Sequence, residues 1–352
     1  MKILLHGATN WGSTNFGDFL YGYQIFKYLK GKHKNLEVNF FEPSKYFKKY
    51  IPLSDKVNIF NANYLVYIPG GYFGEGHNAS LINNIIQFVR FIPFGLLGLL
   101  FHKKILVVGV GAGPLNCWFL RLAIKKICSR CKGLTVRDIE SLNYLKTIGI
   151  NKGQEYSDMM LAYNLSEISV STLQTEEIEK IKKQGKKILL VHYNHSEEAR
   201  DKFAEVASGF INGNSDYYVV VASDSILTYE NDYYISFLKK YKNKCFHFIY
   251  DNPFEMIKLL EIVDVVLTCK LHVGVVSIML NKPVICAAEH PEKSKRFYKL
   301  INHSENCCSL YENNSVYILN LLNKYKTLNL RIPNSEIEKA MCHWKTIDTI
   351  FR

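Results

Sequence analysis

The sequence predicts an α/β protein with two doubly wound, Rossmann-like domains that face each other across a cleft. Short apolar runs alternate with amphipathic stretches along most of the 352 residues, as expected when each strand is followed by a helix. Some runs, such as residues 188–191 and 219–221, are continuously apolar, which is typical of parallel strands buried on both faces.

The first half begins with an apolar run at residues 2–6, and glycine or polar residues follow each later run. Strands are expected at residues 2–6, 36–41, 65–68, 104–109 and 133–137. The stretches between them repeat apolar residues at helical spacing. Helices are therefore expected at residues 17–30, 79–100, 117–130 and 138–147.

The second half repeats this alternation after a polar stretch, residues 164–177, which is rich in Ser, Thr and Glu. Strands are expected at residues 187–192, 216–222, 245–250, 264–268 and 282–287. Helices are expected at residues 174–183, 196–211, 231–241, 254–262 and 271–281. The polar stretch indicates a linker. We therefore expect one domain at 1–165, a second at 175–330, and a C-terminal helix at 331–352 that packs back on the first domain.

The composition excludes collagen, coiled coils and extensive disorder, because 48% of residues are apolar and 22% are charged. The formal net charge is +12, which favours anionic ligands, an anionic membrane or nucleic acid. The lysines are dispersed and no nucleic-acid motif is present, so we expect no nucleic-acid partner. Most of the lysines are expected to be solvated surface residues.

The nine cysteines and the N-terminus favour a cytoplasmic protein. Residues 1–7 lack the long apolar core of a signal peptide, so free thiols in a reducing compartment are expected. Cys128 and Cys131 form a single CxxC pair without a second pair or a histidine cluster. A zinc site needs more ligands, and no metal site is expected.

The longest stretch without polar side chains is residues 91–101. A membrane-spanning helix needs about 20 apolar residues, so none is expected. Two interpretations stay open for this stretch, which His102, Lys103 and Lys104 follow. It could lie on an anionic membrane face, or it could be a helix buried inside a domain, which we favour.

Candidate site residues occur where predicted strands end, because ligands of open parallel sheets bind at that edge. Asn15, Gly17 and Asp18 open the first helix, where an anion or a close-approaching substrate could bind. Asp18 could equally be a favourable charge in the first helical turn.

The strand at 65–68 is followed by a glycine-rich segment, residues 69–77, predicted to be a loop that approaches a ligand. It contains Gly71, Glu75 and His77. The two polar side chains could face a sugar hydroxyl, or they could be solvated.

Arg137 ends the strand at 133–137 and precedes a helix. A guanidinium there is well placed to bind a phosphate or carboxylate through two parallel hydrogen bonds. The alternative is a surface ion pair with Asp138.

In the second half, Lys270, Leu271 and His272 connect a predicted strand to an apolar helix. A lysine and a histidine at a helix N-terminus form a positive pocket, and histidine exchanges protons near neutral pH. Residues 287–293 come from the next predicted strand and are expected to line the same cleft. His192, Asn194 and His195, at the end of the strand at 187–192, could line it as well, or they could have no part in it.

Several segments together resemble the polysaccharide pyruvyltransferase family. The matching residues in the first half are Asn15, Gly17, Asp18, Leu20, Gly70, Gly71, 109–115, 136–141, Leu145, Gly149 and Asp158. Those in the second half are 270–272, 281–285, Lys293 and Phe297. They follow the order of the family over about positions 1–300. The family usually has Arg-Leu-His where this chain has Lys270, Leu271 and His272; the charge is kept, but the planar guanidinium is lost.

The resemblance implies a GT-B-like fold with the acceptor on the first domain and the donor on the second. It implies phosphoenolpyruvate as donor, with no other cofactor and no metal, and a sugar of a surface polysaccharide or its lipid-linked precursor as acceptor. The product would be a cyclic pyruvate ketal. We expect peripheral contact with the inner face of the cytoplasmic membrane.

The candidate residues then divide by role. Donor binding is assigned to Arg137, Lys270, Leu271, His272 and Lys293, acid or base catalysis to His272 and Asp18, and acceptor binding to Asn15, Gly71, Glu75 and His77. Two other classes stay open. One is a GT-B glycosyltransferase with a nucleotide-sugar donor, and the other is a non-catalytic basic module, which the dispersed lysines disfavour.

Overall fold

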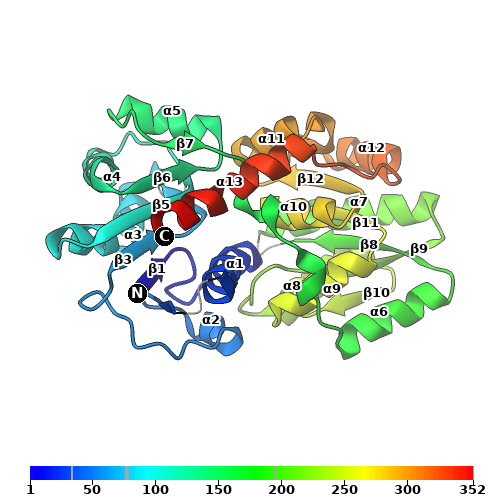
Figure 1. The fold of residues 1–352 in the computed structure, drawn as a ribbon. Coiled ribbons are helices and arrows are strands. Elements are labelled where there is room, and N and C mark those ends of the chain that lie inside the picture. Colours follow the sequence, from blue (N-terminus) through cyan, green and yellow to red (C-terminus); the bar gives the residue numbers. More distant parts are fainter. Residues whose placement is uncertain (33–34, 76–78, 194–195, 352) are drawn as a thin grey trace. The chain divides into compact units, whose positions relative to one another are not determined.

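The computed structural model describes residues 1–32, 35–75, 79–193 and 196–351, which form two compact units (Figure 1). Unit 1 comprises Met1–Thr14, Asp18–Tyr163 and Asn334–Arg352, and unit 2 comprises Asn15–Gly17 and Asn164–Pro333. Each unit contains a parallel sheet whose strands alternate with helices along the chain. The predicted α/β class with two doubly wound domains is therefore confirmed.

The sheet of unit 1 has the strand order β2-β1-β3-β5-β6-β7, with β4 paired to β5. Its strands are β1 (Lys2–His6), β2 (Glu37–Phe40), β3 (Tyr64–Tyr67), β4 (Gly70–Phe73), β5 (Lys104–Ala112), β6 (Gly133–Val136) and β7 (Gln154–Glu155). Its helices are α1 (Phe16–Lys32), α2 (Lys45–Tyr50), α3 (Leu81–Leu100), α4 (Trp118–Arg130), α5 (Ile139–Thr147), η2 (Met159–Ala162) and α13 (Asn334–Phe351).

The sheet of unit 2 has the order β10-β9-β8-β11-β12-β13. Its strands are β8 (Lys187–His192), β9 (Tyr217–Ala222), β10 (Cys245–Phe248), β11 (Val265–Thr268), β12 (Val284–Ala288) and β13 (Cys307–Ser309). Its helices are η3 (Leu165–Ile168), α6 (Leu173–Lys183), α7 (Glu197–Gly213), α8 (Glu230–Tyr241), α9 (Pro253–Ile262), α10 (Leu271–Met279), α11 (Pro291–Leu300), η4 (Ser304–Asn306) and α12 (Ser315–Tyr325). This is the strand order of dinucleotide-binding domains, and it reverses between β8 and β11.

Sequence chemistry explains these elements locally. Ile188 to Val191 of β8 are completely buried, as expected for a central strand covered on both faces. Asn252 caps α9 by accepting a hydrogen bond from the Phe254 amide, and Pro253 occupies the first turn, where its missing N–H costs nothing.

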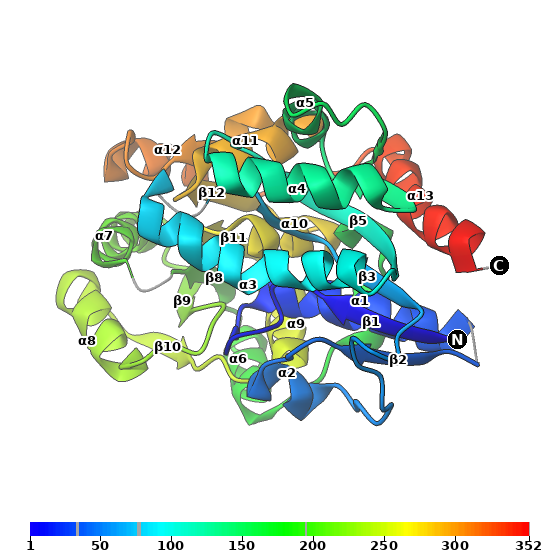
Figure 2. The same ribbon diagram turned by 90° about the vertical axis from the view of Figure 1, so that its left-hand side faces the viewer.

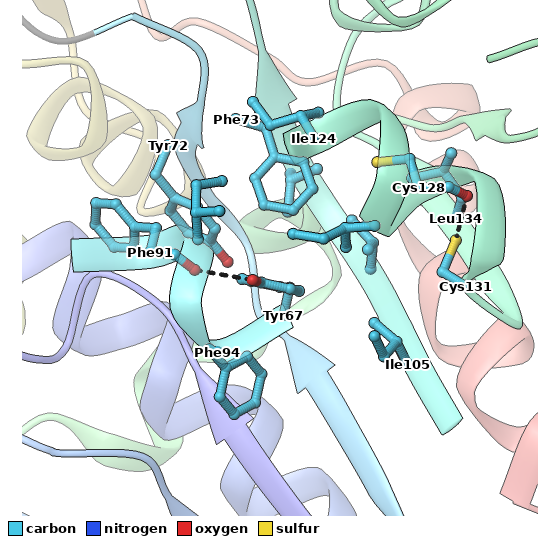
Figure 3. Packing of buried hydrophobic residues seen from close by; sticks show 14 of the residues in the cluster. Tyr67, Tyr72, Phe73, Phe91, Phe94, Ile105, Ile124, Cys128, Cys131 and Leu134 are labelled. Atoms are coloured by element: carbon cyan, nitrogen blue, oxygen red, sulfur yellow. Dashed lines mark hydrogen bonds between the residues drawn. The ribbon is translucent and has the colours of Figure 1, made fainter. Parts of the chain in front are cut away.

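Helices α3 and α4 pack side by side on one face of the unit 1 sheet (Figure 2). In the core beneath them, the Tyr67 hydroxyl donates to the carbonyl of Phe91 at 2.8 Å (Figure 3). The same hydroxyl accepts from the amide of Gly95 at 2.8 Å. A Cβ on Gly95 would lie 2.6 Å from that hydroxyl, so glycine is what lets α3 approach the sheet.

Helix α3 is longer than residues 91–101, the stretch without polar side chains that the sequence analysis considered. The helix has 20 residues, and by length and composition alone it could cross a membrane. Its C-terminal half is nevertheless built into the core, since Phe91, Ile92 and Phe94 are at most 3% exposed. For these residues the interpretation as a buried helix is confirmed.

Residues Gly70–Phe73 of the glycine-rich segment after β3 form a strand and not the predicted loop. Gly70, at φ +155°, leads into β4, which pairs with β5 and turns Tyr72 and Phe73 into the core. Strand β5 also continues past its predicted end to Ala112. Buried apolar side chains follow the first glycines of both segments and favour this additional strand pairing. The glycine content of the sequence obscured that signal.

Some elements were not predicted, namely α2, β4, β7, η2, α11, η4, β13 and α12. The short helix η3 lies within the stretch expected to be a linker. Helix α13 belongs to unit 1. There His343 contacts the Thr135 hydroxyl through Nδ1 at 2.8 Å and the Ser157 carbonyl through Nε2 at 2.9 Å.

Candidate functional site

A polar site within unit 2 lies where the strand order of its sheet reverses. Strands β8 and β11 are neighbours here, and their last residues, His192 and Thr268, are partners in register. His192 Nδ1 is hydrogen-bonded to the Thr268 hydroxyl at 2.8 Å. Ligands of open α/β sheets bind outside the strand ends at such a reversal.

Asp224 follows β9 and is 3% exposed. One carboxylate oxygen, Oδ1, lies 3.7 Å from His192 Nε2, and the other accepts a hydrogen bond from the Asn15 amide at 2.8 Å. The backbone carbonyl of Asp224 accepts from the Phe16 amide at 2.8 Å. Asp224 therefore ties the segment Asn15–Gly17 to the end of the unit 2 sheet.

His192 is uncharged at neutral pH. Its pKa is lowered to about 4, chiefly because burial disfavours the charged ring; nearby Asp224 opposes this effect and Lys270 adds to it. A neutral, completely buried imidazole is suited to positioning neighbouring groups, and it is a poor proton donor at pH 7.

Lys270 is the N-cap residue of α10, and its ammonium lies 2.8 Å from a Glu289 carboxylate oxygen. Burial alone would lower the pKa of Lys270, but the neighbouring Cys269, Asp224 and Glu289 raise it overall. Lys270 thus provides a permanent positive charge beside the first turn of α10, where backbone N–H groups and the helix dipole also favour anions.

His272 lies in the first turn of α10 and packs against Gly17. A Cβ at position 17 would overlap the imidazole of His272. Gly17 is therefore required by this close approach, which explains the glycine of the opening motif in physical terms. Leu271, the first residue of α10, is half-buried.

Arg137 belongs to a separate, buried cluster in unit 1. Its Nε lies 3.8 Å from Asp138 and its Nη1 lies 4.0 Å from Asp158. The Tyr21 hydroxyl donates to the Asp158 carboxylate at 2.7 Å. Burial opposes the charge of Arg137, but the neighbouring Tyr21, Asp158 and Asp138 outweigh it and raise its pKa. The guanidinium is thus already compensated by carboxylates.

The other predicted residues lie on several elements, and Asn194 and His195 lie outside the described residues. Asp18 is in the first turn of α1 in unit 1, and Gly71 is an exposed residue of β4. Glu75 accepts a hydrogen bond from the Cys117 amide at the start of α4. Lys293 is an exposed residue of α11. His77 lies outside the described residues.

Within unit 2, the structure brings together predicted residues of this site, namely Asn15, Lys270, Leu271, His272, His192 and Glu289, and adds Asp224. Asp224 was missed by the sequence analysis. The signal was present, because this carboxylate comes two residues after a strongly predicted strand. Within the described part of the chain, no group of three or more His, Cys, Asp or Glu side chains could hold a metal ion.

Solved structures similar to this chain share its fold at low sequence identity. UDP-GlcNAc 2-epimerase from Neisseria meningitidis, bound to UDP-GlcNAc, has a TM-score of 0.66 and 10% identity over 99% of this chain and 100% of that one. A protein from Listeria monocytogenes described as a putative UDP-N-acetylglucosamine 2-epimerase has a TM-score of 0.66. It is 10% identical to this chain, and the match covers 99% of this chain and 96% of that one. Anabaena Alr3699/HepE, in complex with UDP and glucose, has a TM-score of 0.54 and 12% identity, and the match covers 100% of this chain and 98% of that one. These likenesses show the GT-B fold.

A comparison with curated proteins finds no match. A family comparison does, since the family model described as polysaccharide pyruvyl transferase matches residues 15–291. That range covers most of the chain and includes the Asn15–Gly17 segment, the Arg137 cluster and the unit 2 site. The chain belongs to the polysaccharide pyruvyl transferase family.

Proposed function

We propose that the protein transfers the pyruvyl group of phosphoenolpyruvate to two hydroxyls of a sugar, forming a cyclic ketal. The sugar would belong to a cell-surface polysaccharide or to its lipid-linked precursor. One observation carries this proposal most directly, namely the pairing of a charged Lys270 with His272 at the start of α10, where the unit 2 sheet reverses.

The positive charge at the start of α10 is complementary to the anionic groups of phosphoenolpyruvate. Phosphoenolpyruvate carries a phosphate and a carboxylate, and Lys270 with the first turn of α10 offers a cation and backbone donors. Glu289 holds the lysine through one hydrogen bond, which leaves two N–H groups of the ammonium for an anion. Arg137 and Lys293 are the further donor-binding residues in this proposal.

In the proposed reaction, a proton adds to the methylene carbon of the donor and makes the adjacent carbon electrophilic. One sugar hydroxyl attacks that carbon, the bond to phosphate breaks, and a second hydroxyl closes the ketal ring. Two hydroxyl protons are released. One balances the proton gained by the methylene carbon, and the other leaves with inorganic phosphate.

We assign the acid and base role at the donor to His272, because it lies beside Lys270 and its ring can exchange protons near neutral pH. Asp18 is proposed to act on the acceptor hydroxyls, with Gly71 and Glu75 nearer the sugar. Asn15 acts indirectly in this scheme, since its amide binds Asp224.

Calorimetric titration with phosphoenolpyruvate tests the donor assignment. Lys270→Ala should weaken binding about tenfold or more, because a charge-assisted hydrogen bond to an anion is lost. Lys187→Ala is the matched control: Lys187 begins β8, at the opposite end of that strand from the site, and pairs with Asp216 at 3.0 Å. Equal weakening in both variants, or no binding by the unaltered protein, would contradict the assignment.

A second candidate is glycosyl transfer from a nucleotide-sugar donor. It is supported by two of the similar structures, which hold UDP-GlcNAc in one case and UDP with glucose in the other. The same titration with UDP and other nucleotides separates the two. Nucleotide binding that depends on Lys270, without phosphoenolpyruvate binding, would favour glycosyl transfer. Lys270→Arg then asks whether a planar guanidinium improves phosphoenolpyruvate affinity at this position.

A further inference from the structure

Unit 1 carries an apolar surface on α3 and α4, which we name the α3–α4 face. Its exposed apolar side chains are Leu81, Ile82, Ile85, Ile86 and Val89 of α3 and Trp118 and Leu122 of α4. The two helices are adjacent (Figure 2), and Phe88 contacts Phe119 between them with ring centroids 5.7 Å apart. Ile82 is 72% exposed and Trp118 is 71% exposed. Contiguous apolar surface of this kind marks an interaction site.

The charged side chains that α3 and α4 themselves carry have one sign. Neither α3 nor α4 contains an Asp or a Glu. Their charged residues are Arg90 on α3 and Arg121, Lys125, Lys126 and Arg130 on α4. Trp118, Arg121, Leu122 and Lys125 follow one another at helical spacing and are all exposed, so apolar and positive side chains share one side of α4.

We propose that the α3–α4 face docks unit 1 on the surface of an anionic lipid bilayer. The apolar side chains would enter the boundary between headgroups and acyl chains, and the α4 cations would bind lipid phosphates. Trp118 suits this boundary because its ring is apolar while its indole N–H remains hydrated. The proposal does not rest on the pyruvyl-transfer proposal, although it would bring the protein close to a lipid-linked acceptor.

The structure favours this occupant over two others. A second copy of the chain would set the same positive charges against one another across a two-fold interface. A membrane-crossing α3 would have to leave the sheet, where Gly98 packs against Leu65 and Ile105. The docking residues also differ from the run expected from sequence, residues 91–104, because Phe91 and Phe94 are buried in the core.

Vesicle flotation tests the proposal without the enzyme's substrates. The protein should float with vesicles of equal phosphatidylcholine and phosphatidylglycerol, and much less with phosphatidylcholine alone. The uncharged pair Ile82→Ser and Ile86→Ser should lower the bound fraction about tenfold, since it removes apolar insertion and leaves the charge unchanged. The matched control pair is Leu173→Ser and Val316→Ser, two exposed apolar residues of unit 2 helices, and it should float normally.

Tryptophan quenching then identifies the contacting face. In a Trp11→Phe background, only Trp118 and the buried Trp344 remain. Lipids brominated on their acyl chains should quench the emission of Trp118, and this quenching should disappear in the Ile82→Ser and Ile86→Ser pair. A variant with Arg121→Glu and Lys125→Glu should lose about tenfold in binding to anionic vesicles at low salt.

Three results would overturn the proposal. The first is equal flotation of both serine pairs, which would mean that net charge alone binds the vesicles. The second is retention in the membrane after extraction with carbonate at high pH, which would indicate a spanning helix. The third is a dimer in solution, measured by light scattering, that the Ile82→Ser and Ile86→Ser pair converts to monomer without any vesicle binding by the unaltered protein.

Discussion

The two units share one architecture, but different side chains surround the point where the strand order of each sheet reverses. In unit 1 the strand order reverses between β1 and β3, whose last residues, His6 and Tyr67, are partners in register. In unit 2 it reverses between β8 and β11, whose last residues are His192 and Thr268. Each reversal thus carries a completely or almost completely buried histidine.

The neighbours of the two histidines differ. The ring of His6 contacts Phe41, Tyr67 and Phe94, with centroids 4.6–5.8 Å apart. His192 instead contacts the Thr268 hydroxyl and lies near Asp224. The place in the fold that binds ligands in many α/β proteins is therefore closed by aromatic packing in unit 1 and lined by polar groups in unit 2. Fold position makes a site available, and side chains decide whether it is used.

The aromatic closure of unit 1 predicts the largest effect, on stability. Phe94→Ala should lower the free energy of unfolding by about 3–5 kcal/mol, because a completely buried ring is lost and a cavity remains. Chemical denaturation followed by circular dichroism measures this. Ile82→Ala, an exposed position on the same helix, should change stability by less than about 0.5 kcal/mol. Phosphoenolpyruvate binding by folded Phe94→Ala should be unchanged, and its loss would mean that this closed position takes part in the site.

The polar site in unit 2 predicts the next effect, which is on the rate of proton transfer. His272→Ala should slow proton delivery to the donor about 100-fold or more, since a general acid or base is removed. Deuterium incorporation from heavy water into the methylene group of phosphoenolpyruvate, followed by NMR, reports this step. Donor affinity should change by less than about threefold. Equal losses in exchange and affinity would instead assign His272 to binding.

The buried histidines predict sensitivity to acid. The pKa of His192 and that of His343 are each lowered to about 4, chiefly by burial, whereas histidine in an unfolded chain titrates near about 6.5. Between these values the unfolded state binds the additional proton, so stability falls as pH falls through this range. From pH 7 to pH 5 each residue should cost about 2 kcal/mol.

Urea denaturation at both pH values measures this loss. His192→Gln and His343→Gln should each flatten the pH dependence, whereas His102→Gln, at an exposed position, should leave it unchanged. Among the described residues, unit 1 contains two buried histidines with a lowered pKa, His343 and His6, whose pKa is lowered to about 3. Unit 2 contains one, His192. Parallel pH curves in the wild type and both variants would refute the assignment.

The smallest predicted effect concerns the close contact between Gly17 and His272 within unit 2. Gly17→Ala would place a methyl group against the His272 ring, so deuterium exchange should fall about tenfold while the fold survives. Gly31→Ala is the matched control in the same helix, because nothing lies within 4 Å of a Cβ there. It should leave exchange unchanged and stabilise the helix by about 0.5–1 kcal/mol.

Residue patterns predicted the sheets and much of the unit 2 site. Continuous apolar runs located β8 and β11, and the polar residues at their ends pointed to His192, Lys270 and His272. The same patterns pointed to Glu289, within residues 287–293, as part of this site. Asp224 could not be predicted in the same way, because it follows a different strand and only the strand order brings it to the same edge.

Other features depended on packing that a local pattern does not contain. Gly70 and Gly71 have the composition of a loop, yet pairing with β5 and burial of Tyr72 make the segment a strand. Arg137 was correctly placed at a strand end. Its compensation by Asp158 and Tyr21 required contacts far along the chain, which residue spacing alone does not reveal.

The return of α13 to unit 1 has a consequence for the order of folding during synthesis. Ribosomes release a chain from its amino end, so every residue of unit 2 emerges before Asn334–Phe351. Unit 2 can therefore assemble while unit 1 still lacks the helix that supplies partners to Thr135 and Ser157. The first part to be translated is therefore the last to be completed. During that interval the polar groups of Thr135 and Ser157 lack their partner on α13, and the incomplete unit is open to chaperones and proteases.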